Sequence, residues 1–348
     1  MFERFNTTFT FFKIFMKKSL LAISVIACTF SFSCAQFKKG AAIPETPDTI
    51  GTGNYEGGRI TTLEVPDNAL SFLAIGDWGR NGEFHQKDVA NRMGEAAGQL
   101  GAEFVLSLGD NFYPNGVASV DDYQFTRSFE DIYSDHSLMV DWFVILGNHD
   151  YRGNPDAQIQ YSNISRRWRM PARYYSFERQ LDDDSGEKAL FVFIDTNPFE
   201  KKYYTEDTYR VAVSSQDTTR QKVWLEKTLS ESKAKWKFVI GHHPLYSGGK
   251  RIKETGDVRA SFEEIFERHR VDAYFAGHEH DLQHNRAKTV HHFISGAGSE
   301  IRPTGRAEFT LFGKSIQGFL CASLTGKSLL IQAVDYRGNV LYKTRIEK

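Results

Sequence analysis

Cysteine is scarce in this sequence. Only Cys28, Cys34 and Cys321 occur among its 348 residues, and the first two lie within or at the end of a segment with the features of an export signal. Because only Cys321 would remain well inside the mature chain, a disulfide framework is excluded as the source of stability. Cys321 stands in the apolar run of residues 318–322, and we interpret it as a small buried hydrophobic residue.

An excess of charge of either sign is also lacking. The chain carries 43 Lys and Arg against 44 Asp and Glu, which gives a formal net charge of -1. Proteins that bind nucleic acids usually show a basic excess, so we expect no nucleic-acid partner. Aromatic residues make up 14% of the chain, but they do not alternate with basic residues as on base-stacking surfaces. We therefore expect the aromatic side chains to fill the core.

The sequence has no hydrophobic run long enough to predict a stable membrane span. Leu20–Phe32 is interrupted only by Ser and Thr, but it is short for a bilayer. It follows Lys17 and Lys18, and this order of a positive and an apolar segment is typical of a secretory signal peptide. Small residues at Ser33 and Ala35 predict cleavage after Ala35. We therefore expect export to the periplasm or the extracellular space.

Two alternatives concern the same segment. Met16 could be the true start, because Met16, Lys17 and Lys18 open like a bacterial secretory signal. Cys34 could be a lipidated first residue, which would anchor the exported protein to a membrane surface. Simple export is favoured, because Ser31 stands before Cys34 at the place where a Leu is usual.

The chain divides into three parts by its composition. Residues 1–35 are the predicted signal peptide. Residues 36–68 carry Pro, Thr, Gly and charges without apolar periodicity, and we interpret them as a linker or an irregular lead-in. Residues 69–348 contain short apolar runs that end in polar motifs, and this part is the predicted folded domain.

Strand-length apolar runs recur through this domain. They are Leu70–Ile75, Phe104–Leu108, Trp142–Leu146, Leu190–Ile194, Trp236–Ile240 and Ala273–Ala276. Continuous rather than alternating apolarity indicates strands that are covered on both faces. The final third adds the strand-like runs Val290–Ile294, Ser328–Val334 and Val340–Lys343. These later runs favour a second sheet that packs on the first.

Apolar residues at helical spacing lie between the predicted strands. The stripes are Val89, Met93 and Ala97; Phe125, Phe129 and Ile132; Val223, Trp224 and Leu229; and Phe262, Ile265, Phe266 and His269. Ser261 is the candidate cap of the last helix, and we expect His269 to be a structural histidine. Alternation of strands and helices with short connections predicts an α/β fold.

Polar motifs follow five of the predicted strands. They are Gly76-Asp77-Trp78-Gly79, Gly109-Asp110-Asn111-Phe112-Tyr113, Gly147-Asn148-His149-Asp150, Gly241-His242-His243-Pro244 and Gly277-His278-Glu279-His280. Ligands of open α/β sheets bind beyond the carboxyl ends of the strands, so these motifs should converge on one site. Any one of them alone would more often be a turn, a cap or a structural histidine. All five in order at strand ends indicate a functional site.

The residue types in these motifs suit metal ions. Asp offers hard anionic oxygen, His offers imidazole nitrogen, and Asn offers a neutral amide oxygen. The motifs contain no thiolate, which argues against a structural zinc or an iron–sulfur site. Two carboxylates, one amide and three histidines exceed what one ordinary ion binds, so we expect two ions that share a bridging carboxylate.

The motifs resemble those of the calcineurin-like metallophosphoesterases, and within that superfamily the small purple, or tartrate-resistant, acid phosphatases. Many superfamily members place a His two residues after the first Asp, where this sequence has Gly79. Tyr113, three residues after Asp110, replaces that His, and this exchange marks the smaller family. Ile194-Asp195-Thr196 and Trp224-Leu225 also recur in similar places, so the resemblance covers about residue 70 to the C-terminus. It implies a sandwich of two mixed β-sheets flanked by helices, with the active site at the strand carboxyl ends.

The resemblance also implies a dinuclear metal centre. A ferric ion would be held by Asp77, Asp110, Tyr113 and His280. A divalent iron, zinc or manganese ion would be held by Asp110, Asn148, His242 and His278. Asp110 would bridge the two ions. A phenolate is a strong anionic donor that suits a hard trivalent ion, which is consistent with this division.

The implied activity is that of a secreted acid phosphatase. Such an enzyme hydrolyses phosphate monoesters by attack of a metal-bound hydroxide on phosphorus. His149 lies next to Asn148, and it would stabilise the phosphate or protonate the leaving alkoxide. Small phosphomonoesters would be the substrates, and we expect a monomer.

One stretch departs from the pattern of the mammalian members. They have a second catalytic His several residues after the His242 motif, whereas residues 247–252 of this chain contain none. Lys250 or Arg251 could bind substrate phosphate instead, and Arg suits bidentate contact better. Solvated loop charges are an equal alternative. We expect His243 to pack beside the ligands rather than bind metal.

Two other functions are compatible with the same residues. A phosphodiesterase or nucleotide pyrophosphatase would use the same dinuclear centre, because both reactions cleave a P–O bond at metal ions. A non-catalytic exported phosphate- or metal-binding protein is the second alternative. Pseudoenzymes usually lose a ligand, and this chain lacks none of the expected set.

Overall fold

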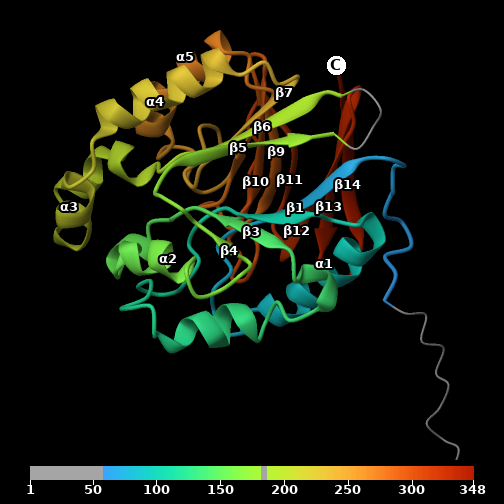
Figure 1. The fold of residues 1–348 in the computed structure, drawn as a ribbon, viewed down its shortest axis with the longest axis horizontal. Coiled ribbons are helices and arrows are strands. Elements are labelled where there is room, and N and C mark those ends of the chain that lie inside the picture. Colours follow the sequence, from blue (N-terminus) through green and yellow to red (C-terminus); the bar gives the residue numbers. More distant parts are fainter. Residues whose placement is uncertain (1–57, 182–185) are drawn as a thin grey trace, which may run out of the picture. The chain divides into compact units, whose positions relative to one another are not determined.

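Two β-sheets form the centre of the fold. A computed structural model describes residues 58–181 and 186–348, and the strands in these ranges make two seven-stranded mixed sheets (Figure 1). In spatial order, the first sheet contains β14 (Val340–Glu347), β13 (Ser328–Asp335), β12 (Gly318–Leu324), β1 (Leu70–Ile75), β2 (Phe104–Ser107), β3 (Asp141–Val144) and β4 (Trp168–Arg169). The second contains β11 (Thr310–Lys314), β9 (Leu282–Ala287), β10 (Val290–Ser295), β8 (Ala273–Ala276), β7 (Trp236–Ile240), β6 (Lys188–Phe193) and β5 (Tyr175–Gln180).

The strands that precede the polar motifs run parallel within each sheet. β1 pairs with β2 and β2 with β3 in parallel, and β6, β7 and β8 do the same in the second sheet. The carboxyl ends of β1, β2 and β3 therefore share one edge of the first sheet, and those of β7 and β8 share one edge of the second.

Helices cover the outer faces of both sheets, and they are α1 (Gln86–Leu100), α2 (Pro155–Tyr161), α3 (Asp207–Ser214), α4 (Thr218–Glu231) and α5 (Gly256–Arg268). In Figure 1, α1 and α2 lie below the first sheet, and α4 and α5 lie above the second. Short helical turns are formed by Phe125–Glu130 (a π-helix) and by the 3-10 segments His136–Leu138, Asp150–Arg152, Asn197–Phe199 and Lys201–Tyr204. The expected sandwich of two mixed sheets flanked by helices is confirmed. The later runs do not form a separate second sheet, because β13 and β14 pair onto the sheet of β1, whereas β10 lies in the other sheet.

Phenylalanine rings fill the space between the two sheets. Phe72 on β1 stacks on Phe104 with ring centroids 5.1 Å apart, and it meets Phe191 and Phe275 of the second sheet at 5.4 and 6.0 Å. All four are fully buried. Each such pair stabilises the fold by about 0.5–1.5 kcal/mol beyond its burial. The aromatic residues thus form the core, as expected.

The predicted stripe on α4 is confirmed at Leu229 and Trp224 and wrong at Val223. Its buried residues are Gln221, Leu225 and Leu229, whereas Val223 is 64% exposed. The side chain of Gln221 is buried because its amide bonds to the backbone of Asp195 at 2.8 and 3.1 Å. A polar residue therefore occupies a place on the inner face that the apolar pattern could not reveal.

The predicted cap of the following helix is also wrong. α5 begins at Gly256, so Ser261 lies inside it, and its hydroxyl donates to the carbonyl of Asp257 at 2.9 Å. A serine inside a helix often bonds back to the preceding turn in this way. His269 follows the last turn of α5.

Residues 58–68 are irregular but tied to the domain. Ile60 and Leu63 are 3% and 9% exposed. The backbone of Glu64 exchanges hydrogen bonds of 2.9 and 2.8 Å with the side-chain amide of Gln332. The predictions for the signal peptide, Met16 and Cys34, and for most of residues 36–68, concern residues outside the described ranges. In the described part of the chain, no helix has the length and apolarity to cross a membrane.

Candidate metal centre

Loops from both sheets meet at one place. Asp77 follows β1, Asp110 follows β2, and Asn148 lies in the loop after β3. From the second sheet, His242 follows β7, and His278 and His280 follow β8. The structure therefore brings all five sequence motifs together.

The backbone in these loops adopts conformations that side chains rarely take. Asp77, Asp110 and His278 have φ angles of 58°, 51° and 67°, in the left-handed region that is costly for residues with a Cβ. Such strain clusters at functional sites, where the surrounding fold holds it. At Gly79, a Cβ would lie 1.8 Å from the carbonyl oxygen of Asn111. Any side chain at position 79 is therefore excluded without moving the second loop.

The first cluster of donor atoms surrounds the hydroxyl of Tyr113. Its oxygen lies 3.0 Å from Asp77 Oδ1, 2.9 Å from Asp110 Oδ2 and 3.2 Å from His280 Nε2. His280 Nε2 is also 3.3 Å from Asp77 Oδ1. The hydroxyl of Tyr113 has one hydrogen, which it can donate to only one of these three atoms at a time. The remaining oxygen and nitrogen atoms are electron-rich and face one another. This arrangement fits a bound cation.

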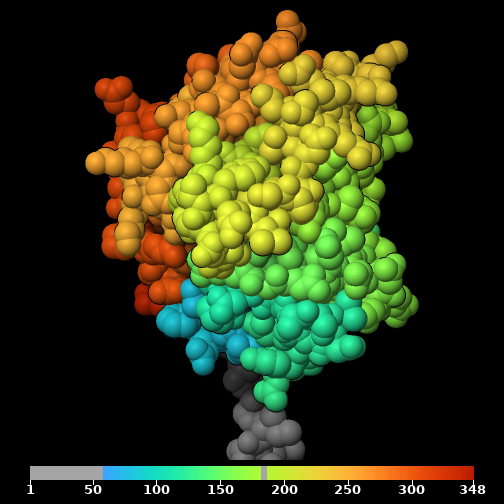
Figure 2. Space-filling model, turned by 90° about the vertical axis from the view of Figure 1, so that its left-hand side faces the viewer, coloured from blue at the N-terminus to red at the C-terminus, as the bar shows by residue number. Residues whose placement is uncertain are grey.

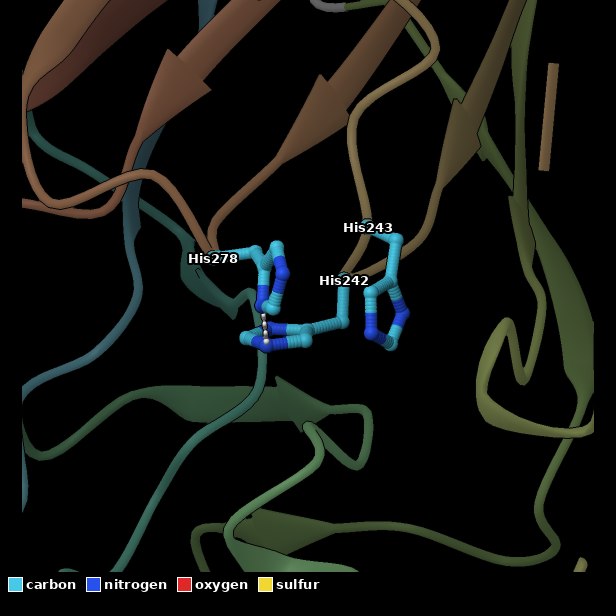
Figure 3. A group of neighbouring side chains, drawn as sticks. All are labelled: His242, His243 and His278. Atoms are coloured by element: carbon cyan, nitrogen blue, oxygen red, sulfur yellow. Dashed lines mark hydrogen bonds between the residues drawn. The ribbon is translucent and has the colours of Figure 1, made fainter. Parts of the chain in front are cut away.

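The second cluster surrounds Nε2 of His242. That atom lies 3.3 Å from Asn148 Oδ1, 3.5 Å from Asp110 Oδ1 and 3.2 Å from His278 Nδ1; Figure 3 shows the two facing imidazole rings. Nδ1 of His242 is 2.8 Å from the carbonyl oxygen of Leu108. Because a carbonyl only accepts, Nδ1 donates to it, and Nε2 is the nitrogen that faces the cluster.

Asp110 belongs to both clusters. Its Oδ2 faces Tyr113 and its Oδ1 faces His242. The side chain is 1% exposed, and Oδ1 also accepts from the backbone N–H of His149 at 2.7 Å. One carboxylate with an oxygen in each cluster is the arrangement that a bridging ligand requires.

His243 lies beside the second cluster with both ring nitrogens engaged. Nδ1 is 2.7 Å from the hydroxyl of Thr196, and Nε2 is 3.0 Å from the hydroxyl of Tyr203. His242, His243 and His278 still offer nitrogens within 4.8 Å of one another, and Figure 3 shows His243 alongside His242. Its hydrogen bonds favour the prediction that it packs beside the ligands.

Burial shifts the charge balance of the site. Burial, opposed by His242, raises the pKa of Asp77 to about 7. Burial acts in the same direction on Asp110, but His242 and His149 outweigh it and lower the pKa of that carboxyl. Burial also lowers the pKa of His280 to about 3 and that of His278 well below its usual value.

These residues fit metal ions. Among the described residues, no Lys or Arg pairs with Asp77 or Asp110, although both carboxylates are buried. Two buried carboxylates with which no cationic side chain pairs are compensated when hard cations occupy the two clusters.

His149 lies at the edge of the two clusters. Its Nδ1 donates to the carbonyl of Pro114 at 2.6 Å, so Nε2 is the free nitrogen, and it lies 3.9 Å from Asp110 Oδ2. The ring packs on Tyr113 with centroids 4.3 Å apart. Its side chain is 14% exposed, and burial lowers its pKa. The free nitrogen therefore faces Asp110 at the edge of the first cluster.

The two candidate phosphate-binding residues differ in their surroundings. Lys250 is exposed. Arg251 pairs with Glu254 at 2.7 Å and has a side chain only 21% exposed. After burial and His243, the charge of Arg251 contributes to the lowered pKa of His278. The assignment of either residue to phosphate binding stays a prediction.

Asp150 is a residue of the site to which the sequence pattern assigned no role. Its buried carboxylate accepts from the backbone N–H groups of Gly147, Asn111 and Phe112 at 2.8, 3.1 and 3.2 Å. It also accepts from the amide of Gln158 at 2.8 Å. These bonds fasten the loop of Asp110 to that of Asn148. The presence of an acidic residue in a motif that begins with Gly was a sign that Asp150 has a role. The sequence of the motif does not show whether such a residue binds a metal ion or holds two loops together.

Comparison with known proteins agrees with the geometry. The calcineurin-like phosphoesterase family matches residues 70–282. Purple acid phosphatase 17 of Arabidopsis thaliana is 38% identical over 311 residues, which cover 84% of this chain and 89% of that protein. Tartrate-resistant acid phosphatase type 5 of Oryctolagus cuniculus is 33% identical over 313 residues, 80% of this chain and 91% of that protein.

A comparison of solved structures supports the fold. GAP50, described as the anchor in the inner membrane complex of Plasmodium, superposes with a TM-score of 0.71 and 23% identity. The match covers 80% of this chain and 89% of that chain. At this level of identity the likeness concerns the fold alone.

Proposed function

This chain belongs to the purple acid phosphatases, within the calcineurin-like phosphoesterases, and on that premise we propose that this metal-dependent acid phosphatase hydrolyses phosphate monoesters after export. The observation that carries the proposal is the position of Asp110. Its two buried oxygens face two separate clusters of donor atoms, and a dinuclear centre needs such a shared carboxylate.

The two clusters suit different ions. The cluster of Asp77, Asp110, Tyr113 and His280 would hold a ferric ion, because it combines two carboxylates with a phenol oxygen. The cluster of Asp110, Asn148, His242 and His278 offers less negative charge, and it would hold divalent iron, zinc or manganese. When bound, the two ions supply Lewis acidity toward phosphate oxygens and a nucleophilic water at acidic pH.

The chain's own residues would complete the reaction. His149 keeps Nδ1 on the carbonyl of Pro114, which fixes the ring and presents Nε2 to the substrate. A proton on Nε2 would stabilise the phosphate and then pass to the leaving alkoxide oxygen. Arg251, which is partly exposed and pairs with Glu254, would contribute positive charge toward a phosphate oxygen.

The cellular location and the oligomeric state are proposed from the sequence alone. The predicted signal peptide of residues 1–35 supports export to the periplasm or outside, as a free protein or through Cys34 as a lipid anchor. We propose a monomer that acts on small phosphomonoesters.

The substrate class can be tested with two related compounds. With the metal-loaded protein, kcat/KM for p-nitrophenyl phosphate should exceed that for its bis-ester by about tenfold or more, a difference of ~1.4 kcal/mol in activation free energy. The reverse order would support a phosphodiesterase or pyrophosphatase. Two bound ions without any turnover would support a non-catalytic phosphate- or metal-binding protein.

Tyr113→Phe tests the ferric assignment. A phenolate on ferric iron gives a broad visible charge-transfer band, so the iron-loaded wild type should be purple or pink and the variant colourless. Loss of the hard donor should also weaken iron binding, while the fold survives because the ring volume barely changes. Visible spectra at equal iron content make the comparison, with the exposed Tyr123→Phe as the matched control. Identical spectra of wild type and Tyr113→Phe would exclude Tyr113 as a ligand.

A further inference from the structure

Several cationic side chains surround the two clusters, and most of them have an acidic partner. Arg80 pairs with Glu300 at 2.5 Å. Lys202 and Arg251 both pair with Glu254, at 2.9 and 2.7 Å. Each of these positive charges is therefore partly compensated before any substrate arrives.

Arg152 differs, because its described partners are all neutral. Its Nε donates to the hydroxyl of Tyr209 at 2.6 Å. Its Nη1 lies 3.4 Å from the carbonyl oxygen of Pro114. It is also 3.1 Å from Nδ1 of His149, which cannot accept from it because that nitrogen donates to the same carbonyl. Within residues 58–181 and 186–348, no carboxylate lies within 4.0 Å of this guanidinium. The charge of Arg152 is thus available to a ligand.

The position of Arg152 beside His149 places it near the leaving alcohol of a substrate, if His149 is the proton donor. It lies against Nδ1 of His149, whereas Nε2 of the same ring faces Asp110. If Nε2 protonates the leaving alkoxide, the carbon skeleton of the leaving alcohol lies next to this ring. A substituent a few bonds beyond the ester oxygen then comes within reach of the guanidinium.

The segment after β6 holds Arg152 in place. Tyr209 on α3 bonds to Nε, and its ring centroid lies 5.5 Å from the guanidinium carbon. Tyr203 in the preceding turn packs on Tyr209 with centroids 4.3 Å apart and bonds to His243. In Figure 2 the residues around 200–215, yellow-green to yellow, cover the middle of the visible face. The guanidinium is therefore half-buried and oriented, which favours selective contact over general attraction.

We propose that Arg152 is a specificity residue that binds a second anionic group, a carboxylate or a phosphate, on the leaving alcohol of the substrate. The proposal rests on the proposed monoester hydrolysis. It narrows the substrate class to phosphate monoesters whose alcohol carries a second anionic group. A guanidinium suits both groups because it offers parallel N–H donors. Arg302 also lacks an acidic partner among the described residues, but it contacts the carbonyl of His278 and not His149.

Binding of two phosphonates tests the proposal without turnover. 2-Carboxyethylphosphonate carries a carboxylate beyond its phosphonate group, and propylphosphonate is its counterpart without that carboxylate. The metal-loaded full chain should bind the first about tenfold more tightly, as a partly buried charge-assisted contact allows. Arg152→Gln should remove that preference, and Arg152→Lys should keep part of it. Arg210→Gln, an exposed arginine next to Tyr209 that pairs with Asp207 at 3.1 Å, is the matched control and should keep it fully.

Turnover gives the second readout. The ratio of kcat/KM for 3-phosphoglycerate to that for glycerol 3-phosphate should fall about tenfold in Arg152→Gln. An equal loss on both substrates, or equal binding of the two phosphonates by the wild type, would overturn the proposal and leave Arg152 with only a role in orienting His149. If Arg152→Gln does not fold, the wild-type preference must still decline as salt screens the contact, and a salt-independent preference would exclude it. If the proposed monoester hydrolysis itself is wrong, the wild-type protein will hydrolyse neither 3-phosphoglycerate nor glycerol 3-phosphate, and this outcome differs from a loss of preference between them.

Discussion

Asp110→Asn is expected to abolish phosphatase activity and to remove most metal from both clusters. The amide keeps the shape of the side chain, but it removes the negative charge that faces both Tyr113 and His242. Two cations held close together repel each other, so loss of the shared anion weakens both sites rather than one. Metal analysis of the purified variant, together with turnover of p-nitrophenyl phosphate, gives the result.

A second Asp→Asn change controls for general loss of structure. Asp335 is the last residue of β13, is 2% exposed and accepts from the backbone of Asn339 at 2.8 Å. Asp335→Asn should keep both ions and the activity. Full occupancy by two ions in Asp110→Asn would rule out the bridging assignment, whatever happens to the rate.

His149→Ala is expected to lower kcat by about 10²–10⁴-fold while metal content stays near normal. The backbone N–H that bonds to Asp110 remains in the variant, so the clusters should keep their geometry. The loss should be smaller for p-nitrophenyl phosphate than for an alkyl phosphate, because a good leaving group needs less protonation. Rates on both substrates and metal analysis at one pH make the comparison.

The matched control for this change is His85→Ala. His85 is a half-exposed histidine that pairs with Asp88 at 2.7 Å, and its loss should leave turnover unchanged. If the two substrates suffered equally in His149→Ala, leaving-group protonation would be the wrong role, and charge stabilisation of the phosphate would remain.

The sequence predicted the strands that carry the site because these strands are continuously apolar. Leu70–Ile75 and Ala273–Ala276 agree with the structure to the residue. β9 was missed, since its buried residues include Gln283, His284 and Asn285, which bond to neighbouring side chains instead of forming an apolar pattern. β5 alternates between half-buried and exposed residues, a pattern that an analysis of continuous apolar runs overlooks.

The residues of the site were predictable to different degrees. Ligand types are limited by metal chemistry, so Asp, Asn and His at strand ends could be chosen from their letters and spacing, whereas Tyr113 was assigned through the family resemblance. The roles of Asp150 and Arg152 depend on where their side chains turn, and neighbouring residues in one motif turn to different partners. Asp150 points inward to backbone N–H groups, whereas Arg152 lies beside His149. Only three-dimensional structure distinguishes these cases.

The division of the ligands between the two sheets has a consequence for folding. Asp77, Asp110 and Asn148 follow strands of the first sheet, whereas His242, His278 and His280 follow strands of the second. Neither half alone can surround an ion, so the complete centre arises only after the two sheets dock through their phenylalanine-rich interface. Metal binding is thereby linked to that docking step, and a bound ion stabilises the assembled sandwich by mass action. A mutation in the interface, far from any ligand, would then reveal itself as an apparent loss of metal affinity.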